Sequence, residues 1–281
     1  MPRVFAFGSD PFDPTHRFET SWLIPPWLLF TLRASFSLYA FTTLFFTLGY
    51  QCAHADIGGC WEARASFSYF TVLTYWGLAF YLLFSSIHTL SYILSPTSTP
   101  LLNTWPRPLQ ALHALFYSTV TTYPFLVTIV YWGVLYPYGS SWFPTQYLAW
   151  GAISEHALNS FFALFEILIP RTTPQPWIHA LWCIIILALY LALAYVTKAS
   201  EGFYTYDFLD PGKTGKLVAA YVFGIGAAAV IVFGIVWCVV WARRWITEEK
   251  LGRRGVFAKG KARVGDMEAH ELGGLGRFAN K

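Results

Sequence analysis

A short polar run, S-E-H-A-L-N-S at residues 154–160, interrupts a long apolar stretch of the chain. If that stretch is a helix, His156 and Asn159 are spaced i,i+3 and Glu155 and Asn159 are spaced i,i+4, so each pair shares a face. An imidazole that takes a proton, with an amide or carboxylate to orient it, is the base of an acyl-transfer site. Polar groups this close together in an apolar helix are expected to face a bundle interior or a wet cavity, and not lipid.

A hydroxyl for such an imidazole to activate occurs at a similar depth in an earlier apolar stretch. That stretch begins F-S-Y-F-T-V-L-T-Y-W at residues 67–76, with Thr71 near its start and Thr74 one turn later. At 1.5 Å per residue, Thr71 lies roughly 6 Å and His156 roughly 10 Å into its own stretch. A hydroxyl held against an imidazole is the minimum for an activated nucleophile. The alternative is that each threonine only hydrogen-bonds its own helix backbone, and spacing alone does not separate Thr71 from Thr74.

The composition requires that these residues belong to a membrane protein. Of 281 residues, 56% are apolar, 20% are aromatic and only 12% are charged. A soluble domain carries about 25% charged residues, and a soluble fold of this size has no core large enough to hide so much apolar surface. The composition therefore excludes an ordinary cytosolic enzyme, a disordered chain, a disulfide scaffold and a coiled coil.

The apolar residues are grouped into stretches of the length that crosses a bilayer, which is about 20 residues for a helix. Six stretches qualify, so the sequence predicts an all-α polytopic membrane protein with six transmembrane helices. The runs are continuous and not alternating, which favours helices over a barrel. Prolines in the separating segments mark helix ends, and Pro124 inside the third span predicts a kink. The predicted spans are Trp27–Gly49, Phe67–Leu94, Leu109–Leu135, Ala149–Ile169, Trp177–Val196 and Leu217–Trp241.

The positive charges indicate the orientation of the spans. Six spans put both termini on one side, and with cytoplasmic termini the inner segments hold fourteen Lys or Arg against four in the outer loops. We expect a cytoplasmic N-terminal segment at 1–26, a six-helix transmembrane domain at 27–242 and a disordered basic tail at 243–281. No signal peptide is visible. The tail is either a soluble stop-transfer extension or a contact for anionic headgroups.

Two cysteines, Cys52 and Cys60, fall in the first outer loop of this topology. An oxidising compartment on that side would join them in a disulfide, and the alternative is a pair of free thiols. We expect an integral membrane location in the endoplasmic reticulum or another endomembrane, with the plasma membrane as the alternative.

Other ionisable residues within the spans lie near the cytoplasmic ends. Arg33 in the first span and Glu166 in the fourth reach the same interface, where they either form an ion pair or extend to it independently. His88, His113 and His179 are also near cytoplasmic ends, where an interfacial imidazole is tolerated.

Three segments resemble the androgen-induced gene family of multi-pass membrane hydrolases. The stretch Y-F-T-V-L-T at 69–74 resembles the family's threonine segment, and E-H-A-L-N-S at 155–160 resembles its histidine segment. The aromatic loop G-F-Y-T-Y-D-F-L-D-P at 202–211 resembles the loop before the family's last helix. The likeness extends from about residue 22 to residue 245, and it excludes the basic tail.

The resemblance implies a six-helix hydrolase with an intramembrane threonine nucleophile, which carries over to Thr71, and a histidine partner, which carries over to His156. Family members cleave fatty acid esters of hydroxy fatty acids, so the expected partners are a membrane lipid ester and the bilayer. Asn159 or Glu155 would orient the imidazole. The candidate hydroxyls for an oxyanion hole, from the outer loop, are Tyr204 and Tyr206.

Functions of other classes compete with this hypothesis. A haem-binding electron carrier needs two facing imidazoles at one depth, which only His113 and His179 approach. A non-catalytic scaffold, or a transporter with Glu155 and His156 as a proton relay, also fits an intramembrane polar cluster. The chain has no Gly-rich phosphate loop and no zinc pattern, so we expect no cofactor, no metal and no nucleic-acid partner.

Overall fold

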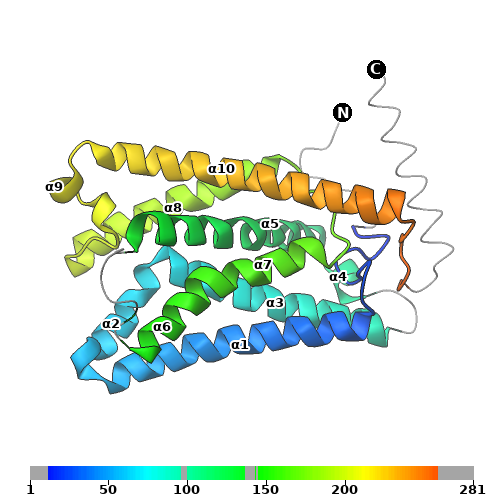
Figure 1. Cartoon of the computed structure of the whole chain (residues 1–281), viewed down its shortest axis with the longest axis horizontal. Helices are drawn as coiled ribbons and strands as arrows, with labels where there is room; N and C mark the ends of the chain where they lie inside the picture. The colour runs from blue at the N-terminus through cyan, green and yellow to red at the C-terminus, as the bar shows by residue number, and fades with distance from the viewer. Residues whose placement is uncertain (1–11, 96–99, 137–142, 144, 259–281) are drawn as a thin grey trace.

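The computed structural model describes residues 12–95, 100–136, 143 and 145–258, and its regular secondary structure is helical throughout these residues. Figure 1 shows an elongated bundle in which the long helices run side by side. Five helices are long and apolar enough to cross a membrane, as predicted for five of the six spans; α5 and α10 each continue into a π-helical segment. These helices are α1 (Pro26–Ala53), α3 (Phe70–Leu94), α5 (Arg107–Val130), α8 (Ile178–Glu201) and α10 (Leu217–Arg244).

The fourth predicted span is helical but interrupted. It consists of α6 (Gln146–Ile153), a π-helical turn η4 (Ser154–Leu158) and α7 (Asn159–Leu168), with no non-helical residue between them. The π turn coincides with the polar run found in the sequence. An inserted residue of this kind changes the direction of the side chains that follow, and it occurs frequently at functional sites.

Short elements connect the long helices at the two ends of the bundle. The end with α2, α6 and α9 lies opposite the end with α4 and the N-terminal described residues (Figure 1). The short helices are α2 (Gly59–Ala65), α4 (Leu101–Thr104) and α9 (Pro211–Thr214), and the 3-10 turns are η1 (Ala55–Ile57), η2 (Ser66–Ser68) and η5 (Asp207–Leu209). The remaining π-helical segments are η3 (Tyr131–Leu135), after α5, and η6 (Trp245–Lys250), after α10.

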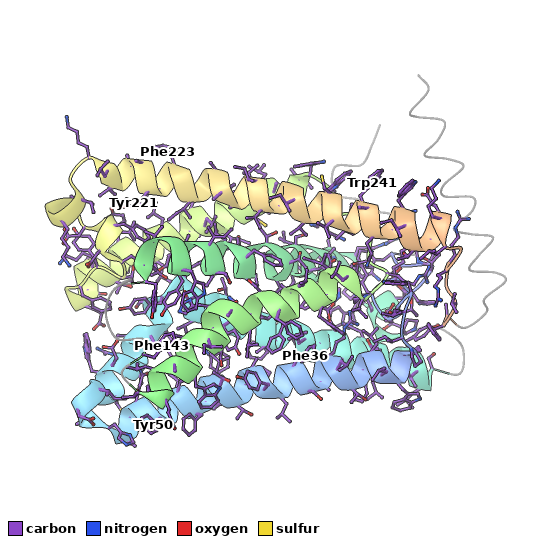
Figure 2. All side chains as sticks on the ribbon, in the orientation of Figure 1. Phe36, Tyr50, Phe143, Tyr221, Phe223 and Trp241 are labelled. Atoms are coloured by element: carbon purple, nitrogen blue, oxygen red, sulfur yellow. A yellow bond between two sulfur atoms is a disulfide. The ribbon has the colours of Figure 1, made fainter. Side chains whose placement is uncertain are left out.

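Apolar side chains both fill the bundle and cover its outside. Tyr75 and Leu78 of α3 pack with Phe162 of α7 in the main core cluster. On the outer side of α10, Phe223 is 78% exposed and Trp241 is 52% exposed (Figure 2). Large exposed apolar side chains on every long helix are those of a surface that lipid covers.

A folded N-terminal segment, residues 12–25, closes the end of the bundle that the sequence assigns to the cytoplasm. The ring of Phe18 contacts His113 and Tyr117 edge-on, with ring centroids 5.1 and 5.9 Å apart. Arg17 donates to Glu248 of η6 at 2.8 Å, and both residues are buried. The expected disordered tail therefore does not begin at residue 243, because η6 is held by this ion pair; residues 259–281 lie outside the described residues.

Arg33 and Glu166 form an ion pair, one of the two arrangements that the sequence left open. The guanidinium donates to the carboxylate through Nε at 2.7 Å and through Nη2 at 2.6 Å, and both residues are fully buried. Nη1 donates to the carbonyl of Phe18 and to Oγ1 of Thr89, both at 2.8 Å. Arg33 thus joins α1, α3, α7 and the N-terminal segment, and it does not extend to the interface alone.

Cys52 at the end of α1 and Cys60 in α2 are joined in a disulfide, one of the two states that the sequence left open. The bridge closes a loop with a sequence separation of 8, so we expect its removal to lower the free energy of unfolding by about 2–3 kcal/mol on the chain-entropy estimate. Peptide mapping of the native protein under non-reducing conditions checks the pairing. The exposed thiol of Cys238 is the internal control, because it should be alkylated in the same sample. Alkylation of Cys52 and Cys60 as well would contradict the bridge.

Candidate functional site

Thr71 lies in the first turn of α3, where a tyrosine from a distant loop meets the helix. The Tyr206 hydroxyl accepts a hydrogen bond from the backbone N–H of Phe70 at 3.1 Å, one of the N-terminal donors that a helix cannot satisfy internally. The same hydroxyl lies beside the Thr71 side chain. Burial raises the pKa of Tyr206 above its ordinary value, so its hydroxyl stays protonated and able to donate.

Thr71 and Tyr206 line an apolar cavity of about 460 Å³. The remaining wall comes mainly from leucine, isoleucine, valine and aromatic side chains of α5, α8 and α10. A cavity of this size and character suits a hydrocarbon chain. Thr71 is therefore one of the few polar residues in the wall of an apolar cavity.

Thr74 faces a different part of the molecule. Its Oγ1 donates to the carbonyl of Thr71 at 3.0 Å, which is the backbone bond common for threonine in membrane helices. Thr74 also lines a separate apolar groove of about 670 Å³ among α3, α5 and α8. The structure thus distinguishes the two threonines, and only Thr71 combines an apolar cavity with a neighbouring hydroxyl.

His156 lies on the π turn η4 with its ring against Tyr131 of η3. The two rings are stacked, with centroids 3.5 Å apart and an interplanar angle of 5°. The His156 carbonyl accepts hydrogen bonds from Thr128 Oγ1 at 2.8 Å and from Trp132 Nε1 at 3.0 Å. Its Nδ1 is buried and has no hydrogen-bond partner among the described residues. The backbone is thus fixed while one ring nitrogen stays uncommitted.

The structure does not bring Thr71 and His156 into one cavity. His156 lines a second, more polar cavity of about 400 Å³ together with Glu155, whereas Thr71 lines the apolar one. Tyr131 lines both cavities. The helices are neighbours as the prediction required, since α3 packs against η4, but the two residues line different cavities that share Tyr131. The position of a residue along its helix predicts its depth in the membrane. It does not predict the direction in which the side chain points around the helix axis.

Asn159 has a different role from the one expected. Its Oδ1 accepts from Ser160 N at 2.6 Å and from Thr128 Oγ1 at 3.2 Å, and its Nδ2 donates to the carbonyl of Pro124 at 3.4 Å. These bonds link α7 to α5 beside the proline, whose ring leaves α5 without one backbone donor. The amide is thus committed to the helix contact and does not orient the imidazole.

Of the other candidates, Glu155 lines the polar cavity beside His156. Tyr204 does not line the apolar cavity, unlike Tyr206; instead the Lys198 ammonium lies 4.7 Å from its ring centroid. Tyr131 is the residue that the sequence analysis missed. Its only signal was the aromatic cluster Y-W-G-V-L-Y at the end of the third predicted span.

The imidazole pair needed for haem is not formed. The ring of His113 lies against His88, with centroids 5.1 Å apart, and His179 Nδ1 is hydrogen-bonded to Ser118 Oγ at 2.7 Å. In the described part of the chain, no group of three or more His, Cys, Asp or Glu side chains is arranged to hold a metal ion.

No protein-family model, curated protein or solved structure matches this chain. Its class therefore follows from its own features. The apolar helices indicate a multi-pass integral membrane protein. The linings of its two candidate cavities include residues of η5, α2 and α6.

Proposed function

We propose that this protein is an integral-membrane hydrolase of lipid carboxylic esters, such as fatty acid esters of hydroxy fatty acids, with Thr71 as the nucleophile and His156 as the base. The observation that carries the proposal is the position of Thr71. It lies in the wall of an apolar cavity, and that cavity shares Tyr131 with the cavity that His156 lines. The likeness of both segments to the androgen-induced gene family supports the same assignment.

In the topology that accompanies this proposal, the interrupted helix α6–η4–α7 is the fourth of six transmembrane spans and both termini are cytoplasmic. The excess of positive charge in the inner segments favours this orientation. The disulfide between Cys52 and Cys60 then faces an oxidising lumen, which suits an endomembrane such as the endoplasmic reticulum. The site lies near the lumenal leaflet, so an ester enters sideways from that leaflet.

The proposed reaction is acyl transfer through a covalent intermediate. Thr71 Oγ attacks the ester carbonyl carbon while His156 accepts the hydroxyl proton, and the imidazolium then returns that proton to the departing alkoxide. Water attacks the acyl-threonine in the second half, again with His156 as base, and releases the acid. The Tyr206 hydroxyl accepts its bond from Phe70, so its own proton is available to stabilise the developing oxyanion.

This reaction requires Tyr131 to turn aside, because its ring forms part of both cavity walls. If the ring is only a gate, its hydroxyl has no chemical role, and we expect Tyr131→Phe to hydrolyse esters within about threefold of the native rate. If the hydroxyl relayed the proton, its removal would instead lower the rate of hydrolysis by about 10²-fold or more. Steady-state hydrolysis in detergent micelles distinguishes the two roles. Tyr136→Phe, from the same polar cavity, is the matched control and should be unchanged.

Activity-based labelling tests the proposed function directly. Membranes containing the protein are treated with a lipophilic fluorophosphonate, and the adduct is located by peptide mapping. We expect phosphonylation of Thr71, because an activated hydroxyl reacts and an ordinary one does not. A protein in which every threonine and serine stays unmodified, and which cleaves no lipid ester, is instead a scaffold or a transporter with a Glu155–His156 relay.

A further inference from the structure

The polar cavity beside His156 combines aromatic walls with two acidic side chains. Two carboxylates line it, Glu62 of α2 and Glu155 of η4, and no Lys or Arg side chain of the described residues does so. Its volume is about 400 Å³, enough for a small organic ion. The aromatic residues in its wall are Tyr69, Trp76, Tyr131, Tyr136, Phe143 and Tyr147.

Two other carboxylates at this end of the bundle are paired on the surface. Glu201 pairs with Arg64 at 2.7 Å and Asp207 pairs with Lys213 at 2.6 Å, all on the exposed surface. Within the described ranges, Glu62 and Glu155 have neither an ion pair nor a side-chain hydrogen bond. Both line the same cavity, so a single cation in it is attracted to both.

Two tyrosines of the aromatic wall are stacked on neighbouring rings. Tyr147 is stacked on Tyr50, with centroids 4.3 Å apart, and its hydroxyl donates to the carbonyl of Thr47 at 3.2 Å. Tyr131 is stacked on His156. A wall residue held by stacking and by a hydrogen bond, as Tyr147 is, loses little conformational entropy on binding.

We propose that this cavity binds an alkylammonium cation, supplied either as a free small amine or as the headgroup of an amphiphile in the adjacent leaflet. Aromatic faces attract such a cation through their quadrupoles, and quaternary ammonium groups are recognised by aromatic cages. The carboxylates add direct attraction and oppose an anionic group in the same place. This inference goes beyond the proposed hydrolysis and needs no reaction at Thr71.

Equilibrium dialysis of the full-length protein tests the site in a non-ionic maltoside detergent, where no ammonium headgroup competes. The probes are radiolabelled choline, its neutral 3,3-dimethylbutyl isostere and dodecyltrimethylammonium. We expect a millimolar or tighter dissociation constant for at least one of the two cations, and binding of the isostere at least about tenfold weaker than choline if choline binds. Similar affinity for both cations identifies a free amine as the ligand; binding of the long-chain cation alone identifies a headgroup.

Charge-removing variants locate the site. Glu62→Gln and Glu155→Gln keep the side-chain shape, and each should weaken cation binding by about tenfold, as expected for a partly desolvated charge contact. Glu201→Gln, a carboxylate at the same end with a surface partner, should bind within twofold of the native protein. The proposal is overturned if neither cation binds, or if both cavity variants bind as tightly as the control. If Glu155→Gln does not fold, Glu62→Gln and the neutral isostere still decide the outcome. Because the assay measures binding and not turnover, its result is independent of whether Thr71 is a nucleophile.

Discussion

Thr71→Ala is expected to abolish ester hydrolysis while leaving the protein folded. The substitution removes Oγ and one methyl from the first turn of α3, and the capping contact from Tyr206 to Phe70 N–H does not involve the lost atoms. We expect a loss of at least about 10³-fold in kcat/KM, with no fluorophosphonate adduct. Steady-state hydrolysis of a lipid ester in mixed micelles measures the loss, and gel filtration with thermal unfolding shows that the fold is retained.

The companion variants separate a catalytic pair from a structural threonine. Thr71→Ser should keep part of the activity, since serine keeps the nucleophile and loses the methyl that fixes its rotamer. His156→Ala should be about as damaging as Thr71→Ala, and the double variant little worse than either, because residues that act as a unit are non-additive. Thr74→Ala is the matched control from the same helix and should have a mild effect, since Thr74 faces the other groove. Full hydrolysis by a well-folded Thr71→Ala protein would rule out Thr71 as the nucleophile.

The helices were the most predictable part of the molecule because bilayer length and proline positions fix their ends. The run preceding Pro96 predicts the end of α3 at Leu94, which is where it ends. The interruption at Ser154–Leu158 was not predictable from hydropathy, since a π turn has the same composition as the α-helix around it. Only the unusual density of polar residues marked that segment.

Pairings along the depth axis were predictable, and directions around the helix axis were not. Arg33 and Glu166 were matched because each lies near the same end of its span, and a buried charge in an apolar bundle requires a partner. Thr71 and His156 were matched in the same way, but depth says nothing about the different cavities that they line. Asn159 was a candidate to orient the imidazole because of its spacing on one helix, whereas two of its three bonds are made to another helix, α5.

The N-terminal segment shows a second kind of limit. Residues 12–25 are polar and Pro-rich for their length, and this composition predicts a solvent-exposed segment. They fold because Arg17 meets Glu248, which is 231 residues away in the sequence, and because Phe18 packs on His113 and Tyr117. Contacts of that range carry no local signal.

Arg33→Ala is expected to give the largest loss of stability of any single substitution in the bundle. It leaves Glu166 as a fully buried carboxylate without its partner, a change that costs about 3–5 kcal/mol. It also removes the bonds that Arg33 makes to Phe18 and Thr89, so the N-terminal segment should loosen at the same time. Unfolding in mixed micelles measures the free energy, and limited proteolysis near residue 18 reports the segment.

The double change with Glu166→Ala decides whether the two residues act as one unit. Removing both partners lowers the free energy of unfolding less than leaving one buried charge unpaired. The double variant should therefore lose less stability than the sum of the two single variants. Arg64→Ala, which breaks the exposed pair with Glu201, is the control and should cost under about 1 kcal/mol. A coupling energy near zero between Arg33 and Glu166 would mean that each is satisfied by other groups. The two hydrogen bonds from Arg33 to Phe18 and Thr89 would then hold the N-terminal segment and α3 independently of the carboxylate on α7.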